Sequence, residues 1–285
     1  INLPADAGGI RLIPAGCLHW PIGEKDLLRE WVKVVKKDPF AYTILMGDSL
    51  DAARTHYRKH IRGYKEDENS QEVLDDMIRG QVRDLAQILL PIKDRIMGVV
   101  LGNHFWEFCD GTNSEQLLCQ YLGLRYLGPF GLLRLDFTDG KSTRAQLTLV
   151  AHHTGGTGGG RTTGGDVNAM VRAENVVDAD IYLFGHTHRR HAHVEKSLAL
   201  TSKGAPRLKE RSRVFIRTGA FLKGYKIDEP KTDRQHRPSY AEAAMYRPTD
   251  LGWVTLKIDL KQQTVGSRAE GTESRILTPR FSCVV

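Results

Sequence analysis

The chain has 285 residues, of which 40% are hydrophobic and 26% charged, so it is long enough to bury a large core as one domain. It has no uninterrupted apolar run near the roughly 20 residues that a membrane helix needs, which argues against a membrane-spanning helix. Lysine and arginine outnumber aspartate and glutamate by 41 to 34, giving a net charge of +7. This charge favours polyanionic partners such as DNA or RNA, although a basic surface also serves solubility alone.

The first residues and the cysteines indicate the compartment. Residues 1–9 lack the basic start and continuous apolar stretch of a signal peptide, although a chain that begins without Met is also compatible with a removed export signal. The four cysteines are too scattered for a disulfide framework, and none forms a CxxC pair. We therefore expect a cytoplasmic protein with reduced thiols.

Short apolar runs alternate with amphipathic stretches in the first two thirds of the chain, a pattern typical of strands joined by crossover helices. The sequence predicts strands over 10–15, 41–46 and 96–101, and a helix over 24–37 that ends at Asp38-Pro39. A charged helical insertion over about 52–90 separates the second strand from the third. Further strands are predicted over 132–137, 146–151, 181–184, 214–217 and 253–258.

These elements predict an α/β fold, a four-layer α/β/β/α sandwich of two mixed sheets, because each sheet must bury one face on its partner and the other under helices. We expect a single domain over residues 1–285, without repeats. Two loops are expected to border the functional site: 155–165, with seven glycines, and a polar C-terminal loop over about 223–250.

Five clusters of potential metal ligands follow predicted strands, where ligands converge in open α/β sheets. They are Cys17-Leu18-His19, Gly47-Asp48-Ser49-Leu50-Asp51, Gly102-Asn103-His104, Ala151-His152-His153 and Gly185-His186-Thr187-His188. Residues two apart on an extended segment point to the same side, so the pairs in CLH and HTH can each face one centre. Imidazole, carboxylate and amide ligands suit Mn, Zn or Fe.

The ordered motifs GDSLD, LGNH and GHTH, within about residues 10–193, resemble the calcineurin-like metallophosphoesterase family. The resemblance implies two divalent ions bridged by Asp48, which together acidify a water and polarise a phosphoryl oxygen. One ion would also take Cys17, His19 and His188, and the other Asn103, His152 and His186. By the same resemblance, His104 would act on the phosphoryl or leaving oxygen, and Asp51 would orient its imidazole.

Two positions depart from the family pattern. The family has aspartate where this chain has Cys17, which leaves three interpretations: a thiolate ligand that favours Zn or Fe, an unligated thiol beside a weakened site, or an engineered substitution. We favour direct ligation, because a thiolate is a strong ligand. Phe105 and Trp106 stand where the family has an acidic residue, which Glu107 would replace imperfectly. Such an aromatic pair is typical of a core and also suits base stacking.

Three further residues are candidates for substrate contact. His153 should point opposite to His152, which leaves it either a substrate contact or a support for a neighbouring ligand. Arg161 lies among glycines whose backbone amides can hold a phosphate, with a merely flexible connection as the alternative. Arg54 begins a basic segment that can guide an extended anion or form a solvated helix face.

The sequence thus predicts a metal-dependent phosphoesterase that needs no organic cofactor. The favoured substrate is a phosphodiester in nucleic acid or a nucleotide. One alternative is a phosphomonoesterase acting on a phosphoprotein or a metabolite, since the same metals and His104 serve either ester. The other is a non-catalytic metal-binding scaffold of the same fold, which Cys17 in place of a carboxylate suggests.

Overall fold

The computed structural model describes residues 1–4, 9–52, 68–138, 143–155, 162–200, 206, 208–225, 239–265 and 274–285. The two candidate phosphate-binding arginines, Arg54 and Arg161, lie outside these residues, as do 53–67, the first part of the predicted helical insertion. No helix in the described ranges is long and apolar enough to cross a membrane.

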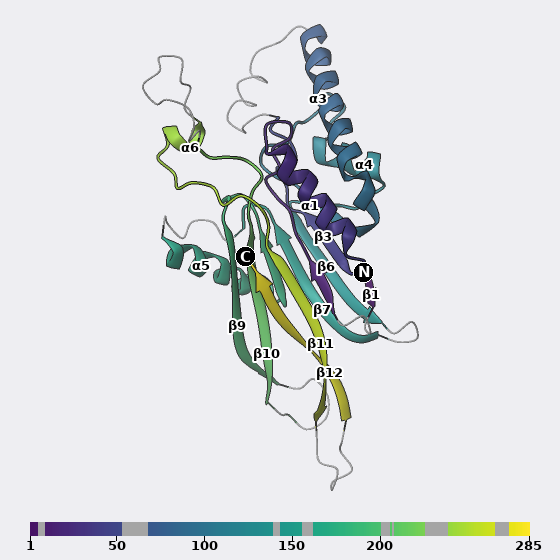
Figure 1. Ribbon diagram of the computed structural model, residues 1–285, viewed down its shortest axis with the longest axis vertical. Helices are drawn as coiled ribbons and strands as arrows, with labels where there is room; N and C mark the ends of the chain where they lie inside the picture. Colours follow the sequence, from purple (N-terminus) through teal and green to yellow (C-terminus); the bar gives the residue numbers. More distant parts are fainter. Residues whose placement is uncertain are drawn as a thin grey trace.

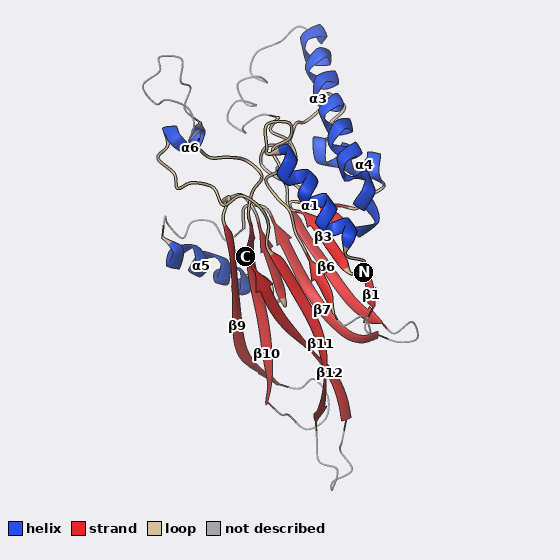
Figure 2. Ribbon diagram, viewed as in Figure 1, coloured by secondary structure: helices blue, strands red, loops and turns tan. Residues whose placement is uncertain are grey.

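Two six-stranded mixed sheets form the body of the molecule (Figure 2). The first sheet, in spatial order, contains β1 (Asn2–Pro4), β6 (Phe130–Thr138), β7 (Thr143–His152), β8 (Ile181–Phe184), β10 (Leu208–Thr218) and β9 (Arg190–Leu200). The second contains β12 (Ser274–Val284), β11 (Thr255–Val265), β2 (Ile10–Leu12), β3 (Ala41–Leu45), β4 (Ile96–Val100) and β5 (Tyr126–Gly128). We call them the β7 sheet and the β3 sheet.

Helices cover the outer faces. Three α-helices and a 3-10 helix accompany the β3 sheet: α1 (Lys25–Lys37), α3 (Glu68–Leu89), η1 (Leu90–Arg95) and α4 (Ser114–Leu122). The helix α5 (Thr163–Val171), followed by η2 (Arg172–Asn175), lies on the opposite side, beside the β7 sheet (Figure 1). A short helix, α6 (Tyr240–Ala243), falls within the predicted C-terminal loop.

Three apolar clusters separate these layers. Trp31 of α1, Leu85 of α3 and Leu118 of α4 pack with residues of the β3 sheet. A second cluster joins the facing sides of the two sheets, and a third packs α5 against β7, β8 and β10. The predicted four-layer α/β/β/α sandwich is therefore confirmed.

Local sequence explains the elements that lead to the site. The helix α1 buries Leu28, Trp31, Val32 and Val35, whose spacing of three or four residues makes one apolar face. The strands β4 and β8 are buried throughout, as expected for strands covered on both sides. The neighbours β2, β3 and β4 run parallel, as do β7 and β8, so the loops after them leave at corresponding ends.

The predicted helix over 24–37 and most predicted strands are confirmed, with differences at the first strand and in three further strands. The first strand ends at Leu12, and Ala15 forms only an isolated bridge with Leu45. The strands β1, β5 and β12 were not predicted. Strand β12 pairs along its whole length with β11, so its regular structure comes from strand pairing and not from a distinct apolar pattern.

Candidate metal centre

The candidate ligands stand on loops with an unusual backbone. Among the described non-glycine residues, six have positive φ, and five of these are candidate ligands: Cys17 (54°), His19 (49°), Asp48 (51°), His186 (67°) and His188 (55°). Such conformations cost of order 1–3 kcal/mol each and persist where the surrounding structure fixes them. The CLH and HTH segments are therefore turns, and not the extended segments from which their pairing was predicted.

The loops after β2 and β3 run side by side. The backbone N–H of Cys17 donates to the Gly47 carbonyl (3.0 Å), and that of His19 donates to the Asp48 carbonyl (2.9 Å). A Cβ on Gly102, after β4, would lie 2.0 Å from the Asp48 nitrogen, so only glycine allows the third loop to approach this closely. Asp48 Oδ1 in turn accepts hydrogen bonds from the backbone N–H groups of Asn103 (2.6 Å) and His104 (2.8 Å).

Asp48 is buried at the meeting point of the two sheets. Its Oδ2 lies 2.9 Å from His153 Nε2 and 3.9 Å from His19 Nε2. Burial opposes ionisation of this carboxyl, but the charge and hydrogen bond of His153 outweigh it and hold the Asp48 pKa well below its usual range. Burial likewise opposes protonation of His153, whose pKa the Asp48 carboxylate nevertheless raises.

Three polar atoms converge at His153. Its Nδ1 lies 2.6 Å from the Met46 carbonyl, which can only accept, so Nδ1 carries a proton. Its Nε2 faces Asp48 Oδ2 and, at 3.0 Å, Asn103 Oδ1. The two oxygens and the nitrogen need a positive charge between them, which either a proton on Nε2 or a metal ion supplies. We call Asp48, Asn103, His153 and His186 the Asp48 cluster.

Of the two adjacent histidines at the end of β7, His153 directs a ring nitrogen at Asp48, whereas the ring of His152 lies elsewhere. The His152 ring packs edge-on against Phe130 (5.8 Å between centroids), and its buried Nδ1 has no hydrogen-bond partner among the described residues. Alternation along β7 explains why the two rings point in different directions, because Leu149 and Ala151 face the other sheet and His153 continues that face. The sequence carried this signal, since Leu147, Leu149 and Ala151 alternate with Gln146 and Thr148. The proposed ligand role therefore passes from His152 to His153.

The turn after β8 supplies two more imidazoles. His186 Nδ1 lies 2.9 Å from Asn103 Oδ1. Although His186 is exposed as a whole residue, desolvation of its ring, followed by the positive charge on His153, lowers its pKa to about 4. Burial and the nearby His19 lower the His188 pKa to about 3. Both imidazoles are therefore neutral near pH 7, which is the state in which histidine binds metals.

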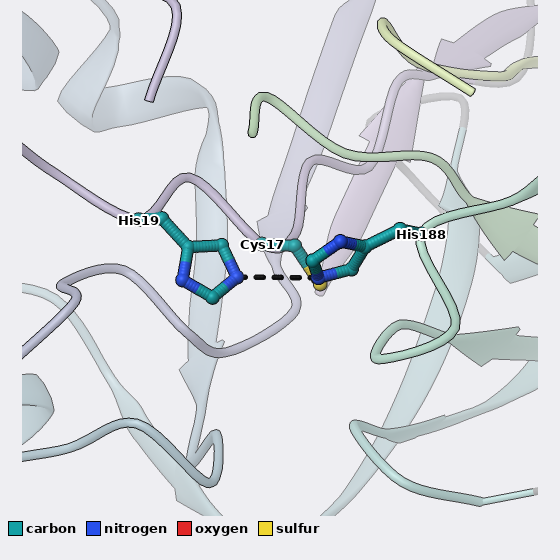
Figure 3. Close-up of side chains that lie close together, drawn as sticks. All are labelled: Cys17, His19 and His188. Atoms are coloured by element: carbon teal, nitrogen blue, oxygen red, sulfur yellow. Dashed lines mark hydrogen bonds between the residues drawn. The ribbon is translucent and has the colours of Figure 1, made fainter. Parts of the chain in front are cut away.

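Cys17, His19 and His188 form a second group, which we call the Cys17 cluster (Figure 3). Their ligand atoms lie within 4.8 Å of one another, and His19 Nε2 is 3.2 Å from His188 Nε2. The backbone N–H of His186 donates to Cys17 Sγ at 3.3 Å. Burial and the charge of Asp48 raise the Cys17 pKa well above its usual value, so the thiol stays protonated unless a cation approaches it.

Asp51 joins the Cys17 cluster to His104. Its Oδ1 lies 3.0 Å from His104 Nδ1 and 3.2 Å from His19 Nδ1. Burial raises the Asp51 pKa, but the contacts with His104 and His19 outweigh this effect and keep it well below the usual value. The carboxylate thus orients two imidazoles, with Nδ1 of each directed at it. The structure brings Asp51 and His104 together as the sequence analysis expected.

A buried carboxyl group that the sequence analysis missed lies behind the Asp48 loop. Glu115, in the first turn of α4, is 0% exposed, accepts a hydrogen bond from Ser114 Oγ and interacts with the Ser49 backbone. Burial raises its pKa to about 7. The capping box of Asn113 and Gln116 marks this helix start in the sequence and could have identified the position.

The aromatic pair after His104 does not present two rings for stacking. Trp106 is buried, and its Nε1 donates to Asp75 Oδ1 at 2.7 Å. Trp106 therefore belongs to the core beneath α3 and α4, which was the first of its two predicted roles.

Known proteins show only distant likenesses to this chain. No protein-family model and no curated protein matches the sequence. Among solved structures, Vps29 from Chaetomium thermophilum is similar, with 12% identity over 96% of this chain and 97% of that chain and a TM-score of 0.38. Vps29 from Entamoeba histolytica complexed with Zn²⁺ shows 11% identity over 96% and 98%, with a TM-score of 0.38. A predicted phosphoesterase from Streptococcus pneumoniae shows 13% identity over 94% and 98%, with a TM-score of 0.31.

With TM-scores below 0.5, these likenesses carry no argument about this chain. The layered α/β architecture therefore rests on the observed elements themselves, two mixed sheets with helices on their outer faces. The candidate ligand groups make metal binding plausible on geometry independent of these comparisons.

Proposed function

We propose that the chain is a metal-dependent hydrolase of phosphate esters that holds two divalent ions. The observation that carries this proposal is the convergence of two oxygens and one imidazole nitrogen, from Asp48, Asn103 and His153, on a point that requires a positive charge. Neutral imidazoles of His186 and His188 and the thiol of Cys17 surround it. This donor set suits Zn, Mn or Fe.

The bound ions would supply an acidified water and polarise the phosphoryl oxygens. Asp48 has the central position, since each of its oxygens faces a different set of groups. His104 would act directly on the substrate: Asp51 holds its Nδ1, which leaves Nε2 for the phosphoryl or leaving oxygen. The His104 side chain is 18% exposed, so a substrate can reach it.

Among phosphate esters we favour a phosphodiester in nucleic acid or a nucleotide. The support is the net charge of +7, which attracts polyanions. The four cysteines are free in the described residues, which fits the expected cytoplasmic setting. The same centre suits a phosphomonoester, so turnover of a bis-aryl phosphate and of an aryl monophosphate with Mn²⁺ separates the two substrate classes. Turnover of the monoester alone would contradict the diester proposal.

Cys17 favours one other function, a metal-binding scaffold without catalysis. Its buried thiol contributes no negative charge where a carboxylate would. In that case the protein binds metal but hydrolyses none of a panel of single- and double-stranded DNA, RNA, cyclic nucleotides and aryl phosphates.

His104→Ala tests the proposed chemistry. We expect the variant to keep its metal, since His104 Nδ1 contacts Asp51 and His104 belongs to neither proposed ligand cluster, and to lose roughly 10²–10⁴-fold in kcat, the usual contribution of a proton-transfer group. Asp48→Asn should lose the ion of the Asp48 cluster and activity together. Metal content by elemental analysis and kcat on the best substrate of the panel provide the measurement. Normal turnover by His104→Ala would remove His104 from the mechanism.

A further inference from the structure

The two clusters of the centre differ in their ligand atoms. The Asp48 cluster offers two oxygens and two imidazole nitrogens, whereas the Cys17 cluster offers one sulfur and two imidazole nitrogens. The sulfur also lies within 4.8 Å of the ligand atoms of Asp48 and His153, so it stands between the two clusters. Oxygen ligands suit Mn²⁺ and Mg²⁺, while thiolate with imidazole suits Zn²⁺. Two positions with unlike donors are expected to prefer different ions.

We propose that Cys17, His19 and His188 form a thiolate–imidazole site that selects Zn²⁺ and retains it when the ion at the Asp48 cluster is removed. The inference rests on the metal centre of the proposed function, but not on ester hydrolysis.

The spacing of the two imidazoles fits one zinc ion. Two nitrogen ligands of a tetrahedral zinc, at Zn–N distances of about 2.0–2.1 Å, lie about 3.3 Å apart. The Nε2 atoms of His19 and His188 are 3.2 Å apart, although His19 comes from the β3 sheet and His188 from the β7 sheet. Figure 3 shows the Cys17 side chain beside the contact of these two rings.

The tautomer of His19 also fits. Asp51 is an acceptor at His19 Nδ1, so that nitrogen carries the proton and Nε2 presents its lone pair to the cluster. His188 Nε2 faces the same point. Because the two Nε2 atoms lie at hydrogen-bond distance, either one shared proton or a cation lies between them.

Cys17 Sγ, the third ligand atom, accepts a backbone hydrogen bond. The backbone N–H of His186 points at Cys17 Sγ, which favours negative charge on the sulfur. On binding, the Sγ–H bond breaks, its proton passes to solvent, and the sulfur's electron pair forms the bond to Zn²⁺ without any change of oxidation state.

All three ligands of the Cys17 cluster are buried, which favours slow release of a bound Zn²⁺. Cys17, His19 and His188 are 0%, 1% and 6% exposed. In the Asp48 cluster, Asp48 and His153 are equally buried, but Asn103 is half-buried and His186 is exposed. Water and chelators therefore have little access to an ion bound in the Cys17 cluster. An ion in the Asp48 cluster has a more accessible ligand.

Cobalt provides a test that does not depend on activity. The metal-free full-length protein is titrated with Co²⁺, and the first equivalent should produce the near-ultraviolet thiolate-to-cobalt charge-transfer band together with the visible spectrum of a tetrahedral ion. Cys17→Ser, which keeps the size of the side chain, should lack the band, and Cys109→Ser, which removes an exposed thiol, should keep it. A wild-type protein that binds Co²⁺ without the band overturns the proposal, whether or not any variant folds.

Zinc retention provides a quantitative test of the same proposal. After dialysis against a weak chelator, the wild-type protein should keep about one Zn²⁺ per chain. Cys17→Ser should bind this ion more than about 100-fold more weakly, since loss of an outer-shell partner alone costs about 10–100-fold. Cys17→Asp should shift the preference from Zn²⁺ towards Mn²⁺. Equal zinc affinity in the wild type and Cys17→Ser contradicts the proposal.

The two proposals fail separately. A charge-transfer band without hydrolysis of any ester supports the zinc site and contradicts the proposed hydrolase. Hydrolysis with two Mn²⁺ per chain, with no band on cobalt loading, supports the hydrolase and contradicts the zinc site.

Discussion

His153 shows at the scale of one residue why the Asp48 cluster is a candidate metal site. Its ring is fixed by the Met46 carbonyl on one side, and its other nitrogen faces two oxygen acceptors. His152, one residue earlier, has its ring against Phe130 and a buried nitrogen without a hydrogen bond in the described structure. Adjacent residues of the same type therefore have different surroundings, which offers a matched comparison.

We predict that His153→Ala weakens Mn²⁺ binding by more than tenfold, whereas His152→Ala changes it by less than about threefold. The expected reason is that only His153 directs a nitrogen at Asp48 and Asn103. Loss of a group that merely supports a metal ligand lowers metal affinity about 10–100-fold, and loss of a ligand itself should lower it at least as much. Equilibrium dialysis of both variants measures the effect, with circular dichroism as the check on folding. The opposite order would restore His152 as the ligand.

At the scale of the element, the helix α4 packs against the loop that carries Asp48. Its capping box and the left-handed Gly123 after Leu122 fix its two ends. Its first turn places Glu115 against the Ser49 backbone, next to Asp48. Because a buried carboxylate is costly, this arrangement makes the packing of α4 sensitive to pH.

We predict that Glu115→Gln stabilises the metal-free protein relative to the wild type as pH rises. The Glu115 pKa is raised from 4.5 to about 7, so the folded wild type binds more protons than the unfolded chain between these values and loses stability as pH rises through that range. The glutamine variant lacks this loss. Its advantage in the free energy of unfolding should grow between pH 5 and 8 to roughly 3 kcal/mol, at about 1.4 kcal/mol per pKa unit.

Urea unfolding of metal-free wild type and Glu115→Gln at a series of pH values checks this prediction. Glu30→Gln, on the exposed face of α1, controls for the loss of one negative charge. A difference between Glu115→Gln and the wild type that stays constant with pH would contradict the raised pKa.

At the scale of the whole molecule, the centre joins the two sheets. Cys17, His19, Asp48 and Asn103 follow strands of the β3 sheet, whereas His153, His186 and His188 follow strands of the β7 sheet. An ion bound by residues of both sheets would therefore link them across the inter-sheet core. A ligand that binds only the folded state also stabilises it by mass action.

We predict that Zn²⁺ raises the Tm of the metal-free protein. At a free concentration of 100 times Kd, the gain is about 2.7 kcal/mol, which corresponds to roughly 5–10 °C for a chain of this size. Differential scanning calorimetry at increasing zinc concentrations measures the shift. The Cys17→Ser variant should shift less, and an equal shift in that variant would place the stabilising ion elsewhere.

The sequence by itself determined the layered α/β architecture and the order of the ligand-bearing loops. Apolar strands alternate with amphipathic helices, and GDSLD, LGNH and GHTH each follow an apolar run, because local patterning sets strands, helices and the turns between them. These features do not depend on which strand lies beside which. The resemblance carried by the motifs then supplied the expected ligand set, which stays a proposal.

Only the tertiary structure decided which side chains share a point in space. The choice of His153 over His152 depends on which face of β7 meets the other sheet, and the contact between His19 and His188 joins residues 169 apart. Glu115 reaches the Asp48 loop only because α4 packs behind it. Such contacts arise from the packing of layers, whereas local sequence fixes only the direction of a side chain relative to its own element.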